Sequence, residues 1–367
     1  MIAIVYPQFY GVGGIARYID SFLANLPPLD RPIILITSDQ LRSPPVYPGV
    51  EIIHLPFSTS RANSFLWGLR VRKLLRELHR AGRIRWVNLH WPPLIPGLFL
   101  PPEIPLLVTA HTTYLGMSGR FYATRHYESQ WSPASVRVKM WMERRILAKA
   151  SRVITLTEQG SQEVRRYGFK GPIGIIPNGA DIQKFGSTGS AARDIDVLFS
   201  GRIELRKGSR PMVRICKELV AARPDIRICI VGYGDDDAWV NSELAPLQAN
   251  VTLAGKVPFD AMVRYYERSR VYVSTSYYEG LPGTCLEAMG MSLPAVVWDF
   301  LFYRGLVVEG QTGMLAPPND FASMATKIGY LLDHPAVATQ LGKAAHDLIV
   351  ERYDWSRLAP EVLAQFE

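Results

Sequence analysis

The sequence predicts an α/β protein with two domains, each built around a parallel β-sheet. The chain has 367 residues, which suits about two domains of ~150 residues, each able to bury a core. Short runs rich in β-branched residues alternate with longer amphipathic segments, as in βαβ units. This alternation occurs twice, and a polar stretch rich in Gly and Ser at 185–190 separates the two series. We therefore expect domains at 1–185 and 186–350 and a C-terminal helix at 351–367.

Each domain is expected to alternate strands and helices from its first strand. In the first domain the expected strands are 2–6, 33–37, 51–54, 86–90, 106–110, 152–157 and 173–176, and the helices are 15–26, 65–81, 136–150 and 158–167. In the second the expected strands are 196–200, 227–231, 251–254, 271–274 and 295–297, and the helices lie near 210–222, 259–268, 283–289 and 321–333. The tail reads as a helix at 355–366.

Composition excludes several classes of protein. Hydrophobic residues make up 48% and charged residues 20%, which argues against long disordered regions. The three cysteines (Cys216, Cys229 and Cys285) form no C-x-x-C pair, so a disulfide framework or zinc site is not expected and a reducing compartment fits. No secretory signal and no uninterrupted apolar stretch of ~20 residues is visible. We expect a cytoplasmic protein, with peripheral binding to the inner face of the cell membrane as an open alternative.

The formal net charge is +8, and the excess is concentrated in segments 70–85 and 137–149. Such segments suit anionic lipid headgroups, phosphorylated substrates or nucleic acid, and the alternative is a solvated helix face. Segment 70–85 is expected to form an amphipathic basic helix, with Leu69, Leu74, Leu75 and Leu78 opposite the arginines. This composition favours an anionic membrane surface, and nucleic acid is not expected as a partner.

The most specific motif places two carboxylates seven residues apart, at Glu279 and Glu287, with a Gly/Pro turn between them. The turn follows a predicted strand and opens a predicted helix, which is where open α/β sheets bind ligands. Backbone amides of Leu281, Gly283 and Thr284 at the start of this helix could bind phosphate oxygens. Two carboxylates can accept hydrogen bonds from vicinal sugar hydroxyls. The alternative is a capped helix with surface glutamates.

A second motif, Gly201-Arg-Ile-Glu-Leu-Arg-Lys-Gly208, directly follows another predicted strand. Arg202 and Lys207 in this loop could neutralise a diphosphate, because arginine offers a planar fork and lysine a point charge. The alternative is a solvated basic loop. The three aspartates at 235–237 more often form a solvated loop than a metal site, so no metal ion is expected.

These motifs, together with Asn178-Gly-Ala-Asp181, Val231-Gly-Tyr-Gly234 and Thr312-Gly-Met-Leu315, resemble glycosyltransferase family 4 in order and spacing over nearly the whole chain. The resemblance implies the GT-B fold, in which two Rossmann-like domains face each other across a cleft. It also implies transfer of a sugar with retention of configuration, without a metal or other cofactor. The first domain would bind the acceptor and the second the nucleotide sugar, and the C-terminal helix would cross back to the first domain.

The resemblance also implies roles for individual residues. Glu279 would contact the donor sugar, Glu287 would hold the ribose hydroxyls, and Arg202 and Lys207 would clamp the diphosphate. Lys256 and Val257 match the segment near the base. In the first domain His111 matches a histidine near the donor sugar, and Gly13 and Gly14 match the glycine loop near the diphosphate. The expected catalytic residues are Glu279, His111, Arg202 and Lys207.

One segment departs from the family pattern. Many members carry a Gly-Gly-x-x-Glu stretch where this chain reads 298–305, and Gly305 stands at the place of the glutamate. The bulky Trp298, Phe300 and Phe302 suggest a reshaped loop near the donor sugar.

The string Gly14-Ile-Ala-Arg-Tyr18 is similar to one in bacterial mannosyltransferases of this family, which mildly favours GDP-mannose over a UDP-sugar. The acceptor is expected to be a glycan or a polyprenyl-diphosphate-linked saccharide in cell-surface polysaccharide assembly. Same-face attack, with the departing phosphate taking the acceptor's proton, is favoured by the resemblance over a covalent intermediate.

Three other functions stay open at this stage. Residues 11–16 fit G-x-G-x-x-A, with Asp39 some twenty residues further on, as in a NAD-dependent oxidoreductase. A nucleotide-sugar epimerase and a non-catalytic subunit on the same architecture are the others.

Overall fold

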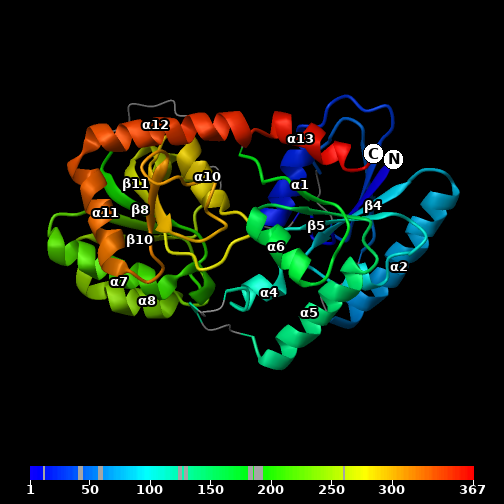
Figure 1. The fold of residues 1–367 in the computed structure, drawn as a ribbon, viewed down its shortest axis with the longest axis horizontal. Coiled ribbons are helices and arrows are strands. Elements are labelled where there is room, and N and C mark those ends of the chain that lie inside the picture. Colours follow the sequence, from blue (N-terminus) through cyan, green and yellow to red (C-terminus); the bar gives the residue numbers. More distant parts are fainter. Residues whose placement is uncertain are drawn as a thin grey trace. The chain divides into compact units, whose positions relative to one another are not determined.

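The computed structural model (Figure 1) describes residues 1–10, 13–39, 44–56, 61–122, 126–127, 131–180, 185, 193–258 and 261–367. The chain divides into two compact units. Unit 1 comprises Met1–Phe121, Trp131–Gly179 and Trp355–Glu367, and unit 2 comprises Tyr122–Gln130 and Ala180–Asp354. The linker expected at 185–190 lies outside the described residues except for Phe185.

Unit 1 is built on a parallel sheet of seven strands in the order β3-β2-β1-β4-β5-β6-β7. The central strands consist largely of β-branched and other apolar residues and are buried on both faces, as expected where helices cover both sides of a sheet. The strands are β1 (Ile2–Val5), β2 (Ile33–Thr37), β3 (Val50–His54), β4 (Trp86–Trp91), β5 (Leu106–Ala110), β6 (Arg152–Thr155) and β7 (Ile173–Ile175). The helices are α1 (Gly14–Ala24), α2 (Arg61–Arg80), α3 (Ile95–Leu98), α4 (Tyr114–Met117), α5 (Pro133–Leu147) and α6 (Glu158–Arg166).

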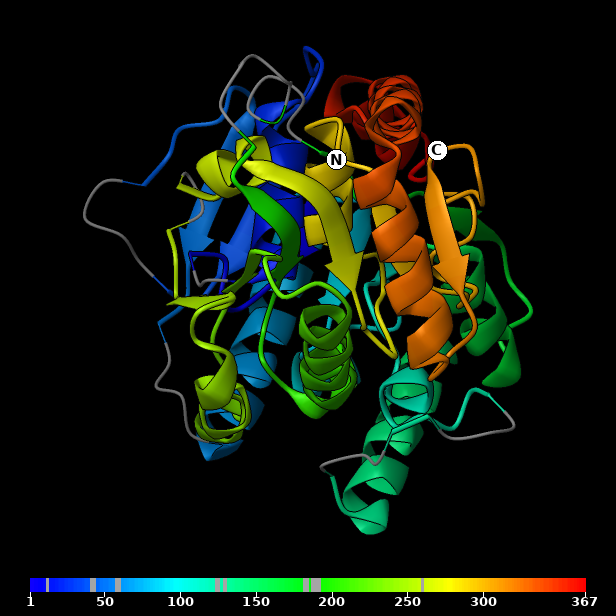
Figure 2. The ribbon, with the colours of Figure 1, turned by 90° about the vertical axis from the view of Figure 1, so that its left-hand side faces the viewer.

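Unit 2 is built on a parallel sheet of six strands in the order β10-β9-β8-β11-β12-β13. The strands are β8 (Ile195–Ser200), β9 (Ile228–Val231), β10 (Val251–Gly255), β11 (Ser269–Ser274), β12 (Ala295–Trp298) and β13 (Gly313–Ala316). The helices are α7 (Ser209–Ala222), α8 (Asp237–Leu244), α9 (Met262–Glu267), α10 (Gly283–Gly290), α11 (Phe321–Asp333) and α12 (Pro335–Arg352), with short 3₁₀ turns η1 (Leu205–Lys207) and η2 (Ala245–Leu247). Helix α11 lies alongside this sheet (Figure 2).

Both sheets confirm the predicted α/β class, and in both the strand order reverses beside the first strand. In unit 2 the reversal lies between β8 and β11, and in unit 1 between β1 and β4. The loops after two such strands diverge to opposite faces of the sheet and leave a crevice at their carboxyl ends, which is where ligands bind in open α/β sheets. In unit 2 these are the loops that carry the two motifs found in the sequence.

The last helix, α13 (Trp355–Ala364), belongs to unit 1. Trp355 is buried, and its ring lies edge-on to Tyr18 of α1 with centroids 4.9 Å apart. Nearer the terminus, Arg152 Nη1 donates a hydrogen bond to the carbonyl oxygen of Gln365 over 2.9 Å. The tail thus packs against α1 and the start of β6, two elements that are far from the tail in the sequence.

The amphipathic pattern expected for α2 is wrong in one respect. Leu75 and Leu78 are buried as expected, but Leu69 is 41% exposed. The buried face is instead completed by Trp67 and Val71, because the spacing of 67, 71, 75 and 78 follows the helical period of 3.6 residues. Leu69 therefore shares the outer face with the arginines.

Candidate active site

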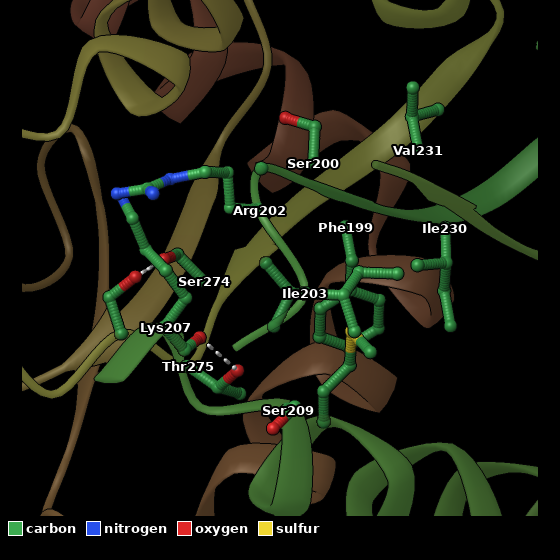
Figure 3. Close-up of a pocket in the computed structure, with 14 residues that line it drawn as sticks. Phe199, Ser200, Arg202, Ile203, Lys207, Ser209, Ile230, Val231, Ser274 and Thr275 are labelled. Carbon is green, nitrogen blue, oxygen red and sulfur yellow. Dashed lines mark hydrogen bonds between the residues drawn. The ribbon is translucent and has the colours of Figure 1, made fainter. Parts of the chain in front are cut away.

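A pocket lies at the switch point of the unit 2 sheet, at the carboxyl ends of β8, β9 and β11. Its lining comes from residues 199–203, 207, 209, 212, 230, 231 and 273–276. Figure 3 shows the side chains of Arg202 and Lys207 extending toward the same side of this pocket. The fold therefore brings the Gly201–Gly208 loop and the loop after β11 together, as the sequence predicts.

Close backbone contacts explain the glycines in the loops after β8 and β9. A Cβ atom on Gly232 would lie 1.8 Å from the carbonyl oxygen of Gly201, and one on Gly208 would lie 2.0 Å from that of Thr275. A Cβ on Gly234 would lie 2.3 Å from the carbonyl oxygen of Ile203. Any side chain at these positions would therefore push apart the loops that form the pocket.

Replacing Gly232 with alanine is expected to lower the free energy of unfolding by about 3 kcal/mol and to abolish nucleotide binding, because the Gly201 loop must move. Urea unfolding and calorimetric titration measure the two effects. Gly82→Ala is the matched control, since Gly82 also has a positive φ (+67°) but open space around it. The control should cost roughly 1–2 kcal/mol and leave binding unchanged. Normal binding in Gly232→Ala would contradict the role given to this loop contact.

Glu279 is the centre of a buried ion network. Its Oε1 accepts hydrogen bonds from Lys207 Nζ and, over 2.9 Å, from Ser276 Oγ. Arg206 Nη1 lies 3.9 Å from the other carboxylate oxygen and donates to the carbonyl of Tyr278 over 3.0 Å. The structure thus brings Glu279 and Lys207 together, and it adds Arg206, which the sequence motif did not single out.

The charges of this network are set by burial and by each other. Burial alone would raise the pKa of Glu279, but Lys207 and Arg206 outweigh it and hold the pKa below its ordinary value. Burial lowers the pKa of Lys207, an effect that Glu279 opposes. At neutral pH Glu279 is therefore a carboxylate fixed in place by two cations. It can accept hydrogen bonds from a ligand but has no proton to donate.

Arg202 is placed differently from Lys207. Its side chain is 60% exposed, and its Nη1 lies 3.4 Å from Glu204 Oε2. Glu204 is buried and also accepts a hydrogen bond from Arg206. Arg202 could therefore turn from Glu204 toward an anion at small cost, since a partly exposed ion pair contributes little.

Glu287 lies on α10, and its position is fixed from another helix. Its Oε2 accepts a hydrogen bond from the hydroxyl of Tyr266, on α9, over 2.8 Å. The same hydroxyl lies 3.5 Å from Ser200 Oγ, at the end of β8. Glu287 is therefore linked to the pocket wall through Tyr266, another residue that the sequence motif does not reveal.

The first turn of α10 carries the expected backbone donors. Thr284 is held by its side chain, whose Oγ1 lies 2.8 Å from Tyr272 OH and donates to the carbonyl of Ser200 over 3.4 Å. Gly283 is the first residue of the helix, and Leu281 lies in the loop that enters it. The first amides of a helix have no partner within it and carry its positive dipole end, so this turn suits an anion.

Lys256 and Val257, expected near the base, follow strand β10. Lys256 is exposed, and its Nζ lies 5.0 Å from the centre of the Tyr233 ring. Tyr233 belongs to the Gly232–Gly234 turn that contacts the Gly201 loop. Lys256 thus lies beside the loops that form the pocket, and neither Lys256 nor Val257 belongs to the pocket's lining.

The remaining predicted residues lie in unit 1. Gly13 precedes α1 and Gly14 begins it, and a Cβ on either would meet nothing within 4 Å. Gly11 and Val12 lie outside the described residues. Asp39 accepts hydrogen bonds from the amide of Tyr10 over 2.8 Å and from the hydroxyl of Thr37, so it braces the β1–α1 loop.

His111 follows β5 and is buried against a second histidine. Its Nε2 lies 2.9 Å from Nδ1 of His90, at the end of β4. Burial lowers the pKa of His111 to about 3, and burial together with His111 lowers the pKa of His90 well below its ordinary value. Both imidazoles are neutral at physiological pH.

This burial predicts a pH dependence of stability. Between pH 6.5 and about 3 these imidazoles are protonated in the unfolded chain but stay neutral in the folded protein. The contribution of the two histidines to the free energy of unfolding should therefore fall, by up to about 1.4 kcal/mol per pH unit for each, as the pH drops below 6.5. Urea unfolding at pH 7, 6 and 5 measures the slope. His111→Gln should flatten it, and equal slopes in both proteins would contradict the prediction.

Of the three aspartates at 235–237, Asp236 serves the local structure. Asp236 accepts a hydrogen bond from Ser209 Oγ and lies 3.6 Å from Arg210. Among the residues that the structure describes, no group of three or more His, Cys, Asp or Glu side chains could hold a metal ion. Metal independence itself stays a prediction.

The segment that departs from the family pattern is packed into unit 2. Trp298, Phe300 and Phe302 are all buried, and the Trp298 indole donates to the carbonyl of Thr275 over 3.1 Å. The bulky residues thus belong to the core of unit 2, and Trp298 contacts the loop after β11. Gly305 is exposed and has a φ of +90°, a conformation that glutamate would adopt only with strain.

Two family models match the chain, one for Glycosyltransferase Family 4 over residues 12–184 and one for Glycosyl transferases group 1 over residues 181–348. The chain is 26% identical to a glycogen synthase of Mycobacterium tuberculosis over 303 residues, covering 80% of this chain and 70% of the relative. It is 30% identical to a phosphatidyl-myo-inositol mannosyltransferase of Mycolicibacterium smegmatis over 199 residues, about half of each protein (52% and 51%).

The solved structures agree in fold. Sucrose-phosphate synthase from Thermosynechococcus elongatus superposes with a TM-score of 0.83 at 21% identity, covering 100% of this chain and 98% of that one. The Anabaena HepE protein, solved with UDP and glucose, superposes with a TM-score of 0.75 at 16% identity, covering 100% and 98%. The two Rossmann-like units, the switch-point pocket and the two family models identify this chain as a member of glycosyltransferase family 4, an enzyme of GT-B fold that uses a nucleotide sugar.

Proposed function

We propose that this enzyme transfers a hexose from a nucleoside diphosphate sugar, with retention and without a metal ion, to a glycan or lipid-linked saccharide. The observation that carries the proposal is the buried network at the switch point of unit 2. There Lys207 and Arg206 hold Glu279 beside a loop that also bears the exposed Arg202. Such a site offers cations for a diphosphate and a fixed acceptor for sugar hydroxyls.

Transfer builds negative charge on the departing diphosphate. Arg202 can turn from Glu204 toward the phosphates, and Lys207 can share its proton donors between them and Glu279. The amides at the start of α10 add a fixed dipole. Positive groups that are already in place where charge develops are the largest source of rate acceleration in such reactions. Together they supply the stabilisation that a metal ion provides in other transferases.

Glu279 is not suited to be the nucleophile of a covalent intermediate. Two cations and Ser276 already satisfy it, and these contacts lower its reactivity toward a carbon centre. This favours same-face attack, in which the departing phosphate accepts the proton of the acceptor hydroxyl. Glu279 then positions the donor sugar by accepting hydrogen bonds from the sugar's hydroxyl groups. Glu287 holds the ribose, with Tyr266 fixing the carboxylate.

GDP-mannose is the first donor to test. The Gly14–Tyr18 string and the similarity to a mannosyltransferase support it. A UDP-sugar is the second candidate, supported by the likeness in fold to a protein solved with UDP and glucose. Lys256 is exposed and Val257 packs partly buried against the core of unit 2, and neither residue favours one base over the other.

A lipid-linked acceptor is supported by the outer faces of two helices in unit 1. Phe65, Leu66 and Leu69 on α2, and Val138 and Trp141 on α5, are between 41% and 57% exposed. The same helices carry the two basic clusters found in the sequence, where Arg145 lies over the ring of Trp141. Exposed apolar and aromatic side chains among cations suit the face of an anionic membrane. No helix in the described residues is long and apolar enough to span a membrane.

Vesicle binding tests the membrane part of the proposal. The protein should sediment with vesicles containing phosphatidylglycerol at low salt and be released as salt rises, because exposed charges are screened. Pure phosphatidylcholine vesicles should bind much less. Equal binding to both, or to neither, would remove the support for a lipid-linked acceptor while leaving transfer itself untouched.

Product analysis tests transfer. The enzyme with GDP-mannose or UDP-glucose and a panel of acceptors should release nucleoside diphosphate in EDTA, and the new linkage should keep the donor's anomeric configuration by NMR. An inverted product would contradict retention. Turnover of the nucleotide sugar without any acceptor would favour an epimerase instead.

A further inference from the structure

A chain of hydrogen bonds runs from the sheet of unit 1 to His111. It begins at Asn88, a buried residue of β4, whose Nδ2 donates to the carbonyl oxygen of Leu107 over 3.3 Å and to Thr109 Oγ1 over 2.9 Å. A carbonyl oxygen can only accept, so the amide nitrogen of Asn88 must face it. This fixes the orientation of the Asn88 amide and leaves its Oδ1 on the opposite side.

Asn88 Oδ1 in turn fixes the proton of His90. The two atoms that face each other are Asn88 Oδ1 and His90 Nε2, which are 2.8 Å apart. Because the amide oxygen can only accept, Nε2 must carry the proton. Burial keeps His90 neutral, and a neutral imidazole carries one proton, so Nδ1 of His90 has only a lone pair.

The same reasoning passes to the second histidine. His90 Nδ1 lies 2.9 Å from His111 Nε2, so His111 must donate from Nε2. His111 is then the Nε2–H tautomer, and its Nδ1 has a lone pair. In the part of the chain that the structure describes, this Nδ1 has no hydrogen-bond partner. The edge of the Tyr18 ring, with centroids 4.8 Å apart and planes at 87°, holds the imidazole in place.

We propose that His90 and Asn88 are positioning residues that lock His111 as a hydrogen-bond acceptor for a substrate hydroxyl. His111 Nδ1 then accepts from an O–H group and cannot donate to a phosphate or act as an acid. The expected ligand is a polyhydroxylated molecule. Its identification as a sugar rests on the proposed function. The relay itself rests on unit 1 alone.

The relay is tested by NMR on the full-length protein labelled with ¹⁵N-histidine. Long-range proton–nitrogen spectra distinguish the two tautomers, and the signals are assigned from those lost in His111→Gln and His90→Asn. We expect both histidines as neutral Nε2–H forms at pH 7. A protonated Nδ1 on His111, or an imidazolium, would overturn the relay without any variant being needed.

Two substitutions of His90 test the positioning. His90→Leu removes the acceptor, so the tautomer preference of His111 should be lost and kcat/KM should fall about tenfold or more. His90→Asn restores an acceptor at the place of Nδ1, so the tautomer and most of the activity should return. Tyr18→Phe is the matched control, because it keeps the ring and removes a buried hydroxyl that has no hydrogen-bond partner among the described residues. It should change neither readout.

The outcomes separate this inference from the proposed function. An unchanged His111 tautomer in His90→Leu would overturn the relay. The changed tautomer with full kcat/KM would overturn the recognition of a hydroxyl by His111. The expected tautomers in a protein that transfers no sugar from any donor would leave the relay standing and reject the proposed function.

Discussion

Replacing Glu279 with glutamine is expected to lower kcat by about 10²–10³-fold and the free energy of unfolding by about 3 kcal/mol. The loss of stability follows because Lys207 and Arg206 would remain as largely buried cations with one carboxylate fewer. The loss of rate follows because the amide cannot hold Lys207 beside the diphosphate. Urea unfolding and initial rates of nucleoside diphosphate release measure the two effects.

The double variant Lys207→Met/Glu279→Gln separates structure from catalysis. It removes both charges of the closest pair, while Arg206 keeps its bond to Glu204. Much of the lost stability should return, since removing both partners of a buried pair costs less than removing one. Activity should stay low. Full activity in the double variant would show that the pair serves only the fold.

Replacing Glu287 with alanine is expected to raise the Kd of the nucleoside diphosphate by at least about 10²-fold. The carboxylate is buried and held by Tyr266. It can therefore accept hydrogen bonds from two vicinal hydroxyls without losing further conformational entropy. Each hydrogen bond to a charged group contributes about 1.5–3 kcal/mol, and two of them account for this change. Tyr266→Phe, which only loosens the carboxylate, should raise Kd by a smaller factor.

A ligand that lacks the ribose hydroxyls makes this prediction specific. Wild-type enzyme should bind the 2′,3′-dideoxy nucleotide much more weakly than the parent. Glu287→Ala should bind the two alike, because the hydroxyls have lost their acceptor. Calorimetric titration of both proteins with both ligands gives the coupling directly. Undiminished discrimination in Glu287→Ala would place the ribose elsewhere.

The regular parts of the fold could be predicted because their signals are local. The runs at 33–37, 106–110 and 321–333 form elements with the expected bounds, since β-branched runs and helical periodicity act over a few residues. Strand β13 and helix α12 were not predicted. β13 is only four residues long and contains a glycine. The buried face of α12 is made of Leu341, Gly342, Ala345 and Ile349, which contrasts little with its surroundings.

In the site, spacing revealed Glu279, Glu287 and Lys207 but not the residues that hold them. Arg206 acts on Glu279 across 73 positions and Tyr266 on Glu287 across 21, and no local pattern marks such pairs. The burial of Trp298 was missed for the same reason, because its partner is the backbone of the neighbouring strand's loop. Sequence spacing thus predicts the groups that would meet the ligand, and tertiary contacts show which residues hold those groups in place.

A thermal-shift comparison of GDP, UDP, ADP and NAD, each with and without EDTA, tests the central claim most directly. A ligand at 100 times its Kd should stabilise the folded protein by about 2.7 kcal/mol. We predict a shift of the melting temperature with GDP or UDP that persists in EDTA and disappears in Glu287→Ala. The nucleotide that gives the larger shift indicates the base of the donor. A shift that EDTA abolishes would contradict metal independence, and a shift with NAD alone would contradict the account as a whole.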